Sequence, residues 1–147
     1  MILRKLNTLV RMDRLRRGLM VEAVLWLAVA RVALLVLPFR VVARRLGKTA
    51  PPASAAEAGA DGEALAKAVG WTVQRMAGYV PFRAVCLQQA LAAKMMLRRR
   101  GVPSVLHLGV ASSSEGPLSS HAWLDVGQAK VTGYPIGSGF TEVVCFI

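Results

Sequence analysis

Hydrophobic residues repeat with a helical period in the first two thirds of the chain and with a strand period in the last third. Residues 2–17 combine leucines at helical spacing with basic side chains, which predicts a short basic amphipathic helix. Residues 18–37 are apolar nearly all round and predict a second helix that ends at Pro38. A short basic helix over residues 39–46 follows, with Gly47 as its end signal.

The middle of the chain changes composition before the helical period returns. Lys48 to Gly62 is rich in Ala, Pro, Gly and Ser, which is the composition of a surface linker. Asp61 is a candidate N-cap for a helix that runs to about Met76. A further helix begins at Cys86, and we expect it to be buried along most of its length. Its apolar stripe continues through Ala90, Ala93 and Leu97.

Beyond Pro103, apolar and polar residues alternate with a period of two, which predicts strands. The first strand covers residues 105–110 and the second covers residues 121–126. Gly127 and Gln128 form a two-residue turn into a third strand, and a last strand follows. These two strands cover residues 129–134 and 141–147. Helices followed by an antiparallel sheet predict an α+β fold.

The chain has 147 residues, of which 54% are hydrophobic, enough for one core without disulfides or a metal. We therefore expect a single domain over residues 1–147. Within it, residues 1–47 form a basic, apolar helical part and residues 48–62 a linker-like loop. Residues 63–147 form the core that carries the candidate chemistry.

The apolar helix over residues 18–37 approaches the length of about 20 residues that a bilayer span needs. Glu22 and Arg31 lie inside it, and a charge near the bilayer centre costs about 3 kcal/mol. A helix packed against the rest of the protein is therefore favoured over a span.

The positive charge is concentrated near the N-terminus, because residues 1–48 hold eleven Lys and Arg against Asp13 and Glu22, a net +9 of the total +11. Such a surface attracts acidic peptides, membrane headgroups or nucleic acid without discriminating among them. Solvated arginines are the plain alternative. The sequence has no RNA-binding signature and no zinc-finger spacing, and few aromatic residues are interleaved with the basic ones, so no nucleic-acid partner is expected. Association with a membrane surface is not favoured but stays open.

The two cysteines, Cys86 and Cys145, are too few for a disulfide framework, and the chain starts without an evident secretory signal. A reducing, cytoplasmic location is expected. The cysteines and histidines lack paired ligand spacing, and no glycine-rich phosphate loop occurs, so neither a metal nor a cofactor is expected. Cys145 lies among apolar residues and is interpreted as a buried structural thiol.

Cys86 and His121 are the candidate catalytic pair. Unpaired backbone N–H groups in the first turn of a helix bias a thiol toward thiolate, and an imidazole on a strand can take its proton. The plain alternatives are a buried cysteine and a structural histidine. His121 is preferred over His107 because it follows a polar loop, whereas His107 lies inside a strand flanked on both sides.

Several stretches of the chain carry a resemblance to a known family. They are Glu22-Ala23, Ala30-Arg31, Pro38-Phe39-Arg40, Cys86-Leu87-Gln88-Gln89-Ala90-Leu91, Leu97-Arg98-Arg99-Arg100-Gly101-Val102-Pro103, Leu108-Gly109-Val110 and His121-Ala122-Trp123-Leu124. Together they resemble the lasso peptide biosynthesis B2 proteins over nearly the whole chain. The resemblance implies a papain-like or transglutaminase-like fold, with a central cysteine-bearing helix packed on an antiparallel sheet and residues 63–147 as the catalytic core.

The same resemblance implies an activity, that of a cysteine peptidase that removes the leader from a lasso precursor. Cys86 would be the nucleophile and His121 the general base and acid. The oxyanion would be stabilised by the backbone N–H of Cys86, with Gln88 a candidate donor by residue type alone. No cofactor or metal is implied.

The family usually has a third catalytic residue, an aspartate on the strand after the histidine strand, at the position where Gly133 stands here. Neither of two possible registers across the turn places a carboxylate opposite His121. The first register pairs Asp125 with Lys130, Trp123 with Thr132 and His121 with Tyr134, and a shift of one residue brings Gly133 opposite His121 instead. The third member is therefore unassigned, and the candidates to orient the imidazole are Tyr134, Thr132, Glu142 and a backbone carbonyl.

The resemblance also implies partners, namely a precursor peptide, a macrolactam-forming synthetase and a separate leader-recognition protein. The last is expected because the N-terminal half shows little sign of the strands of a winged-helix unit. Two other functions stay open. One is a catalytically weak scaffold that gathers the precursor and the synthetase, and the other is a membrane-surface protein held by residues 1–46.

Overall fold

The structure is a computed structural model that describes residues 14–52, 55–111 and 116–147. These residues form four helices and five strands. The helices are α2 (Arg14–Val36), α3 (Phe39–Leu46), α4 (Gly59–Ala77) and α5 (Cys86–Arg98). The strands are β1 (Thr49–Ala50), β2 (Val105–Ala111), β3 (Ser119–Val126), β4 (Ala129–Thr132) and β5 (Thr141–Phe146).

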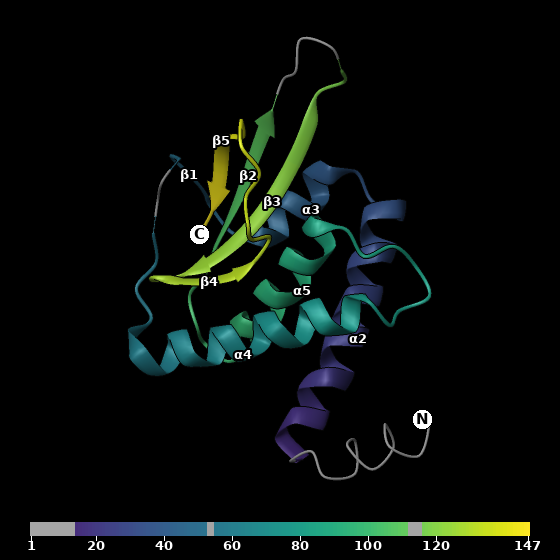
Figure 1. Ribbon diagram of the computed structural model, residues 1–147, viewed down its shortest axis with the longest axis vertical. Coiled ribbons are helices and arrows are strands. Elements are labelled where there is room, and N and C mark those ends of the chain that lie inside the picture. Colours follow the sequence, from purple (N-terminus) through teal and green to yellow (C-terminus); the bar gives the residue numbers. More distant parts are fainter. Residues whose placement is uncertain (1–13, 53–54, 112–115) are drawn as a thin grey trace.

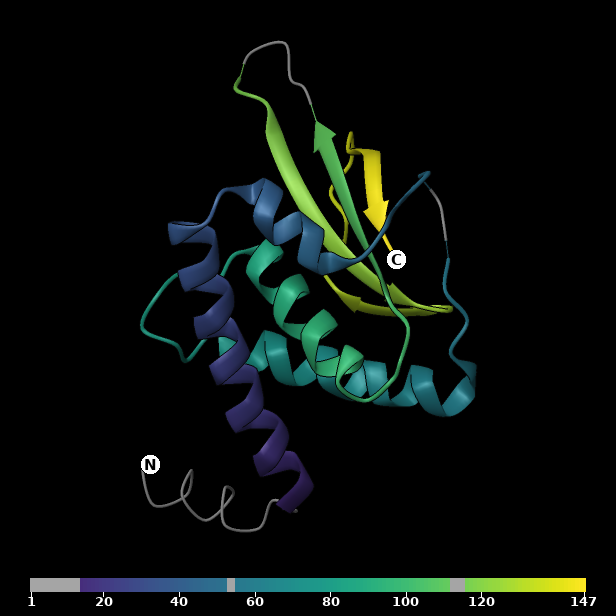
Figure 2. The ribbon, with the colours of Figure 1, turned by 180° about the vertical axis from the view of Figure 1, so that it is seen from behind.

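The helices pack on one face of a single antiparallel sheet. Figure 1 shows the sheet with α4 and α5 close to it, and Figure 2, the view from behind, shows α2, α3 and α5 in front of the sheet. The strand order is β1-β5-β2-β3-β4, so the central strand is β2 and the edges are β1 and β4. The predicted α+β fold class is therefore confirmed, including the cysteine-bearing helix on an antiparallel sheet.

Two of the helix ends lie where the sequence predicts them. α3 has the predicted bounds and stops before Gly47, and α5 begins at the expected residue. Two other expectations are wrong. α2 continues without a break through Gly18, while residues 1–13 of the predicted first helix lie outside the described residues. α4 starts at Gly59, so Asp61 lies in its first turn, where its charge complements the helix dipole, and is not the N-cap.

The expected linker over residues 48–62 contains a strand that the sequence did not predict. β1 pairs antiparallel with the end of β5, so that Thr49 lies opposite Phe146 and Ala50 opposite Cys145. The linker therefore contributes an edge strand to the sheet instead of being a loop throughout its length.

The register between β3 and β4 corrects the predicted pairing around the candidate site. Asp125 lies opposite Lys130, as expected, but the register shifts between Leu124 and Asp125. Leu124 is consequently the partner of Thr132, and both predicted pairings of Trp123 and His121 with β4 are wrong. Gly133 comes to lie against Trp123 instead of opposite His121.

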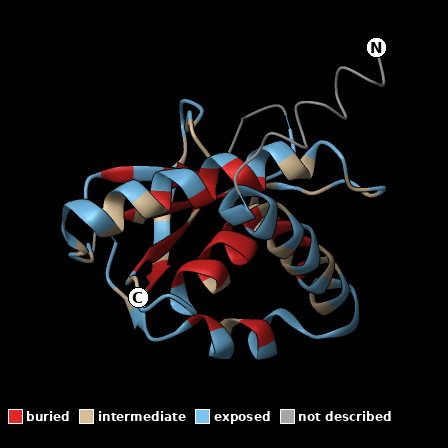
Figure 3. Ribbon diagram, turned by 90° about the horizontal axis from the view of Figure 1, so that it is seen from below, coloured by how far each residue is buried: buried red, intermediate tan, exposed pale blue. Residues whose placement is uncertain are grey.

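The core lies between the helices and the sheet face that they cover. Figure 3 shows the buried residues gathered in the middle of the molecule, with exposed residues on the outer sides of the helices. Alternate residues of the central strands, such as Leu106, Ala122 and Leu124, point into this core and are at most 1% exposed. α5 contributes the most buried helix, as its apolar stripe predicts.

α2 is held on the core by an ion pair as well as by apolar packing. Glu22 accepts hydrogen bonds from Arg99 at 3.0 Å and from Arg100 at 2.6 Å, just beyond the end of α5. The hydrogen bond from Arg100, opposed by partial burial, lowers the pKa of the Glu22 carboxyl. Glu22, one of the two charges that made a membrane span unfavourable, therefore helps to hold α2 against the core. The expectation of a packed helix is confirmed.

Candidate active site

Cys86 occupies the first position of α5, and the residues around it fix the start of the helix. The backbone N–H of Val85 donates to Oε1 of Gln88 at 3.2 Å, and Nε2 of Gln89 donates to the carbonyl of Ala84 at 2.8 Å. Gln88 is buried, and its amide oxygen serves this turn. This contact uses the amide oxygen of Gln88, so the role of oxyanion donor, which would use its amide nitrogen, stays a prediction. The Cys86 side chain itself is half-buried.

Contacts of Lys94, in the second half of α5, show where Cys86 lies along the sheet. Nζ of the buried Lys94 donates to the carbonyls of Ser104 at 2.8 Å and Phe146 at 3.4 Å, where β2 begins and β5 ends. Cys86 lies about 12 Å back along the helix axis, the rise of just over two turns. The start of α5 is therefore directed toward the end of the sheet where β3 begins. Burial, with a smaller effect of Arg98, lowers the pKa of Lys94 to about 8.

His121 lies in β3 within a group of aromatic rings. Its ring stacks on Trp123 with centroids 6.0 Å apart and meets Phe140 at 5.4 Å in a tilted arrangement. His121 and Trp123 alternate along the strand with the core residue Ala122, so they belong to the sheet face opposite the core. Phe140 reaches them from the segment that joins β4 to β5.

A backbone carbonyl orients the His121 imidazole. Nε2 lies 2.6 Å from the carbonyl oxygen of Gly133, the first residue after β4. Because a carbonyl oxygen only accepts, Nε2 carries the proton in the neutral ring, and Nδ1 is left with the lone pair. Of the groups that the sequence offered to orient the imidazole, the structure therefore shows a backbone carbonyl, that of the glycine at the position of the expected aspartate.

The structure does not bring the predicted pair into direct contact. Among the described residues, no hydrogen bond joins the Cys86 thiol to His121, and the two residues come from different layers of the fold. The arrangement supplies a half-buried thiol at a helix start and an imidazole whose Nδ1 holds a lone pair. Cys86 packs against the core, whereas His121 belongs to the opposite face of the sheet, so proton transfer would need a rearrangement that brings the imidazole to the start of α5.

A second polar cluster, which the sequence did not predict, lies on the same sheet face as His121 and is centred on His107. Nδ1 of His107 lies 2.5 Å from Oε1 of Glu142, and Nε2 lies 3.2 Å from Oδ2 of Asp125, close enough for an ion pair but not aligned as a hydrogen bond. The Tyr134 hydroxyl donates to Asp125 at 2.5 Å. Lys130, the cross-strand partner of Asp125, lies over the Tyr134 ring.

This cluster favours a charged imidazole. Burial of His107 disfavours the charged form, but the contacts with Asp125 and Glu142 outweigh burial and raise the pKa of His107. Burial, together with the bond to Asp125, raises the pKa of the Tyr134 hydroxyl, which therefore stays protonated as a donor. The cluster is thus a histidine held between two carboxylates that favour its charged form.

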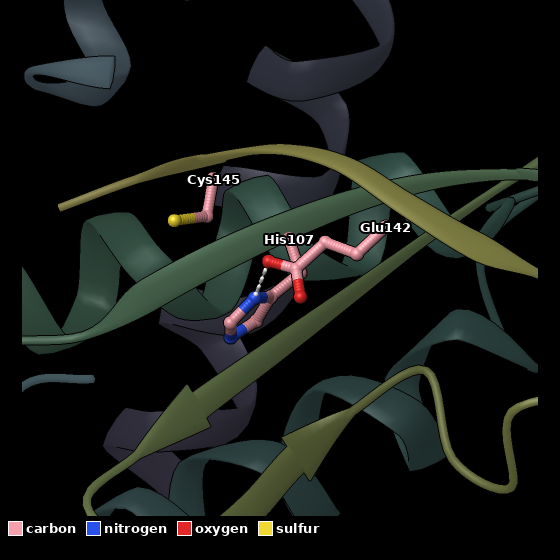
Figure 4. A group of neighbouring side chains, drawn as sticks. All are labelled: His107, Glu142 and Cys145. Atoms are coloured by element: carbon pink, nitrogen blue, oxygen red, sulfur yellow. Dashed lines mark hydrogen bonds and ion pairs between the residues drawn. The ribbon is translucent and has the colours of Figure 1, made fainter. Parts of the chain in front are cut away.

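Cys145 adjoins this cluster, and Figure 4 shows it beside His107 and Glu142. One donor atom from each of the three lies within 4.8 Å of the others, an arrangement that resembles a cysteine–histidine–carboxylate triad and that a metal ion could also use. Cys145 is completely buried, however, and its thiol donates to the carbonyls of Pro51 at 3.1 Å and Ala50 at 3.5 Å. A thiol that serves as donor to two carbonyls is protonated and fits the structural role expected of Cys145.

Trp123 connects the two clusters. Its ring stacks on His107 at 5.5 Å, with planes 10° apart, and on His121 at 6.0 Å, with planes 23° apart. The charged cluster therefore supports the tryptophan against which His121 is placed. Only the residue types of this stack could be read from the sequence, because His107 comes from β2 and is brought to the β3 residues Trp123 and His121 by strand pairing.

A half-buried cysteine at the first residue of a central helix, packed on an antiparallel sheet that carries a histidine, is consistent with a papain-like or transglutaminase-like core. The family model of the Transglutaminase-like superfamily matches residues 33–145, and the chain belongs to this superfamily. Neither a curated protein nor a solved structure matches the chain. The superfamily includes cysteine proteases, and the match spans both Cys86 and His121.

Proposed function

We propose that this protein is a cysteine peptidase that removes the leader peptide from a lasso peptide precursor, with Cys86 as nucleophile and His121 as general base and acid. The observation that carries the proposal is the bond between His121 and the Gly133 carbonyl, because it leaves Nδ1 as a proton acceptor. The half-buried thiol at the start of α5 and the superfamily match support the same chemistry. The precursor as substrate rests on the resemblance in sequence.

The reaction would begin when Nδ1 of His121 takes the thiol proton of Cys86. The thiolate attacks the carbonyl carbon at the junction of leader and core, and the oxyanion is stabilised by backbone N–H groups at the start of α5. The imidazolium then gives its proton to the leaving amine, which frees the core peptide and leaves the leader as a thioester. Water, deprotonated by His121, hydrolyses the thioester and restores the thiol.

Gly133 affects the strength of the base in this scheme. A carboxylate in that position would stabilise the imidazolium by its full charge, whereas the carbonyl oxygen offers only a dipole. The carbonyl does fix the ring and its tautomer, which is the other contribution of such a residue. The proposed enzyme is therefore a dyad with an orienting backbone group, and a slower catalyst than a complete triad.

The partners that we propose are the precursor, a macrolactam-forming synthetase and a separate leader-recognition protein. The decisive experiment incubates the precursor with this protein and these partners and follows the products by mass spectrometry. Cys86→Ala is expected to abolish release of the leader, and Cys145→Ala, the matched control, to retain it. Undiminished cleavage by Cys86→Ala would refute the proposed nucleophile, and loss of cleavage only in Cys145→Ala would move the active site to the buried cluster.

A scaffold that binds precursor and synthetase without cleaving is the second candidate. It is favoured by the missing carboxylate and by the lack of a direct Cys86–His121 bond within the described residues. A scaffold would leave the precursor intact in the same assay, and its Cys86→Ala variant would still associate with both partners. Wild-type cleavage that Cys86→Ala abolishes excludes this candidate.

A further inference from the structure

We propose that the outer face of α2 docks on an anionic lipid membrane. This outer face is the side of the helix turned away from the core. It is formed by Val21, Val24, Leu25, Val29, Val32, Leu35 and Val36, all of which are exposed. The inference rests on burial and charge alone and is independent of the proposed peptidase activity.

The two sides of α2 are separated by the helical period. Leu19, Ala23, Leu27 and Ala30 are buried and form one narrow stripe against the core. At about 100° per residue, the exposed apolar residues fall on the opposite side of the helix axis. Val21, Leu25 and Val32, near the middle of that side, are 58–61% exposed. The helix is therefore apolar toward the core and apolar toward the outside.

Such a face is unusual for a surface helix, which normally turns charged side chains outward. Glu22 and Arg31 are the charged residues between positions 18 and 37. Glu22 is engaged with Arg99 and Arg100 at the core, so it does not interrupt the outer face. The face extends over about 23 Å of helix, from Val21 to Val36, as an apolar strip suited to the headgroup and acyl boundary of a bilayer.

Basic residues border this strip, and they decide the kind of partner. Arg14 lies on the outer side of α2 at its described start, and Arg40 and Arg44 are exposed on α3 just beyond its end. Residues 1–48 have a net charge of +9, which anionic headgroups complement. A second copy would bring the same positive charge against itself, so the charge favours lipid over self-association.

The packing of α2 favours lying on the membrane over crossing it. By length and a mean hydropathy of 2.2, residues 14–36 would qualify as a span, and only 22% of the most apolar stretch is buried. Ala23 and Leu27, however, are completely buried by the rest of the protein, and Glu22 is tied to α5. A span would have to abandon these contacts, whereas docking of the outer face keeps all of them.

The test is sedimentation of the full chain with lipid vesicles. We expect binding to vesicles of phosphatidylcholine with phosphatidylglycerol, little binding to phosphatidylcholine alone, and loss of binding in high salt. Leu25→Glu with Val32→Glu should weaken binding by about tenfold or more, because charges enter the apolar boundary. Both positions are exposed, so the fold should be kept, as circular dichroism would verify. Leu118→Glu, at another exposed leucine, is the matched control and should bind like the wild type.

Two arginine variants test the electrostatic part. Arg40→Gln with Arg44→Gln should weaken binding by about fivefold per charge, whereas Lys67→Gln with Arg83→Gln, which removes two exposed charges elsewhere, should change it much less. Equal effects of the two pairs would refute the basic border.

Three results would overturn the docking itself. Binding to neutral vesicles as strong as to anionic ones would remove the role of charge. Resistance of the bound protein to alkaline carbonate extraction would show a span. A soluble dimer or a complex with an acidic protein, dissolved by Leu25→Glu with Val32→Glu while vesicles are ignored, would assign the outer face to a protein partner.

Discussion

His121 and Gly133 are joined by a bond of 2.6 Å between the imidazole Nε2 and the glycine carbonyl. The bond exists because the chain leaves β4 immediately after Thr132 and brings the next carbonyl against β3. Gly133 has a φ of +83°, a conformation that L-residues with a side chain avoid. Gly133 therefore orients the imidazole through its backbone carbonyl, and this backbone conformation requires glycine at that position.

The first prediction concerns replacement of this glycine. A Cβ on Gly133 would lie 2.4 Å from the carbonyl oxygen of Ala122 and 2.8 Å from Cα of Trp123, so Gly133→Ala meets backbone and not a flexible side chain. We expect a loss of about 2 kcal/mol or more in the free energy of unfolding, measured by urea denaturation.

Gly139→Ala is the control for that substitution, because Gly139 has a similar φ of +88° and open space around it. It should cost about 1 kcal/mol, from backbone strain alone. Equal losses for the two variants would contradict the close packing at Gly133. By the same reasoning, Gly133→Asp would not restore a triad, because its side chain starts from the same blocked position.

Local signals explain the part of the fold that the sequence predicted. Gly47 closes α3, and the apolar stripe after Cys86 marks α5, because helix ends and faces depend on nearby residues. β1 was missed for the opposite reason. Two residues have no period, and Thr49 is placed by its pairing with Phe146, almost a hundred positions away.

The candidate site could be predicted only as residue types. Cys86 and His121 carry recognisable chemistry, but the group that orients His121 is a carbonyl, which every residue has. The register shift between Leu124 and Asp125 leaves Val131 of β4 as an extra residue, and a strand of four residues is too short to reveal such a bulge in its sequence. The cluster around His107 could not be predicted either, because its members come from β2, β3 and β5 and meet only when the strands pair.

A second prediction separates the two thiols by their reactivity. Cys86 is half-buried at a helix start, whereas Cys145 is completely buried and donates to two carbonyls. Iodoacetamide should therefore modify Cys86 at least about tenfold faster than Cys145 in the folded protein. Peptide mass spectrometry after brief labelling measures both sites in one sample. In denaturant the two cysteines should react alike, and preferential labelling of Cys145 in the native protein would contradict the burial on which its structural role depends.

A third prediction concerns the attachment of α2 through Glu22. Glu22→Gln removes the charge that Arg99 and Arg100 share, and the free energy of unfolding should fall by about 1 kcal/mol. Because the pKa of Glu22 is lowered in the fold, its contribution is present above the unfolded pKa of about 4.5 and is lost as the pH falls through the folded value. The wild type and Glu22→Gln should therefore differ at pH 7 and converge in acid.

The control for the third prediction is Glu57→Gln, since Glu57 is exposed outside α4. Urea denaturation at several pH values compares the three proteins. A constant difference between wild type and Glu22→Gln down to strongly acidic pH would mean that the carboxylate charge is not what holds the helix.

The last prediction uses the raised pKa of His107. Burial opposes the charged ring, but Asp125 and Glu142 together raise the pKa above the unfolded value of 6.5. The stabilisation is then complete below about pH 6.5 and is lost as the pH rises through the folded pKa. His107→Gln leaves two carboxylates without their cation and should cost about 3 kcal/mol at pH 6, with a smaller cost at higher pH. Urea denaturation of both proteins across this range measures the change, and Glu142→Gln should reduce the pH dependence of the wild type. If the cost of His107→Gln grew with rising pH, the imidazolium between two carboxylates would be ruled out, because a neutral ring would then be the stabilising form.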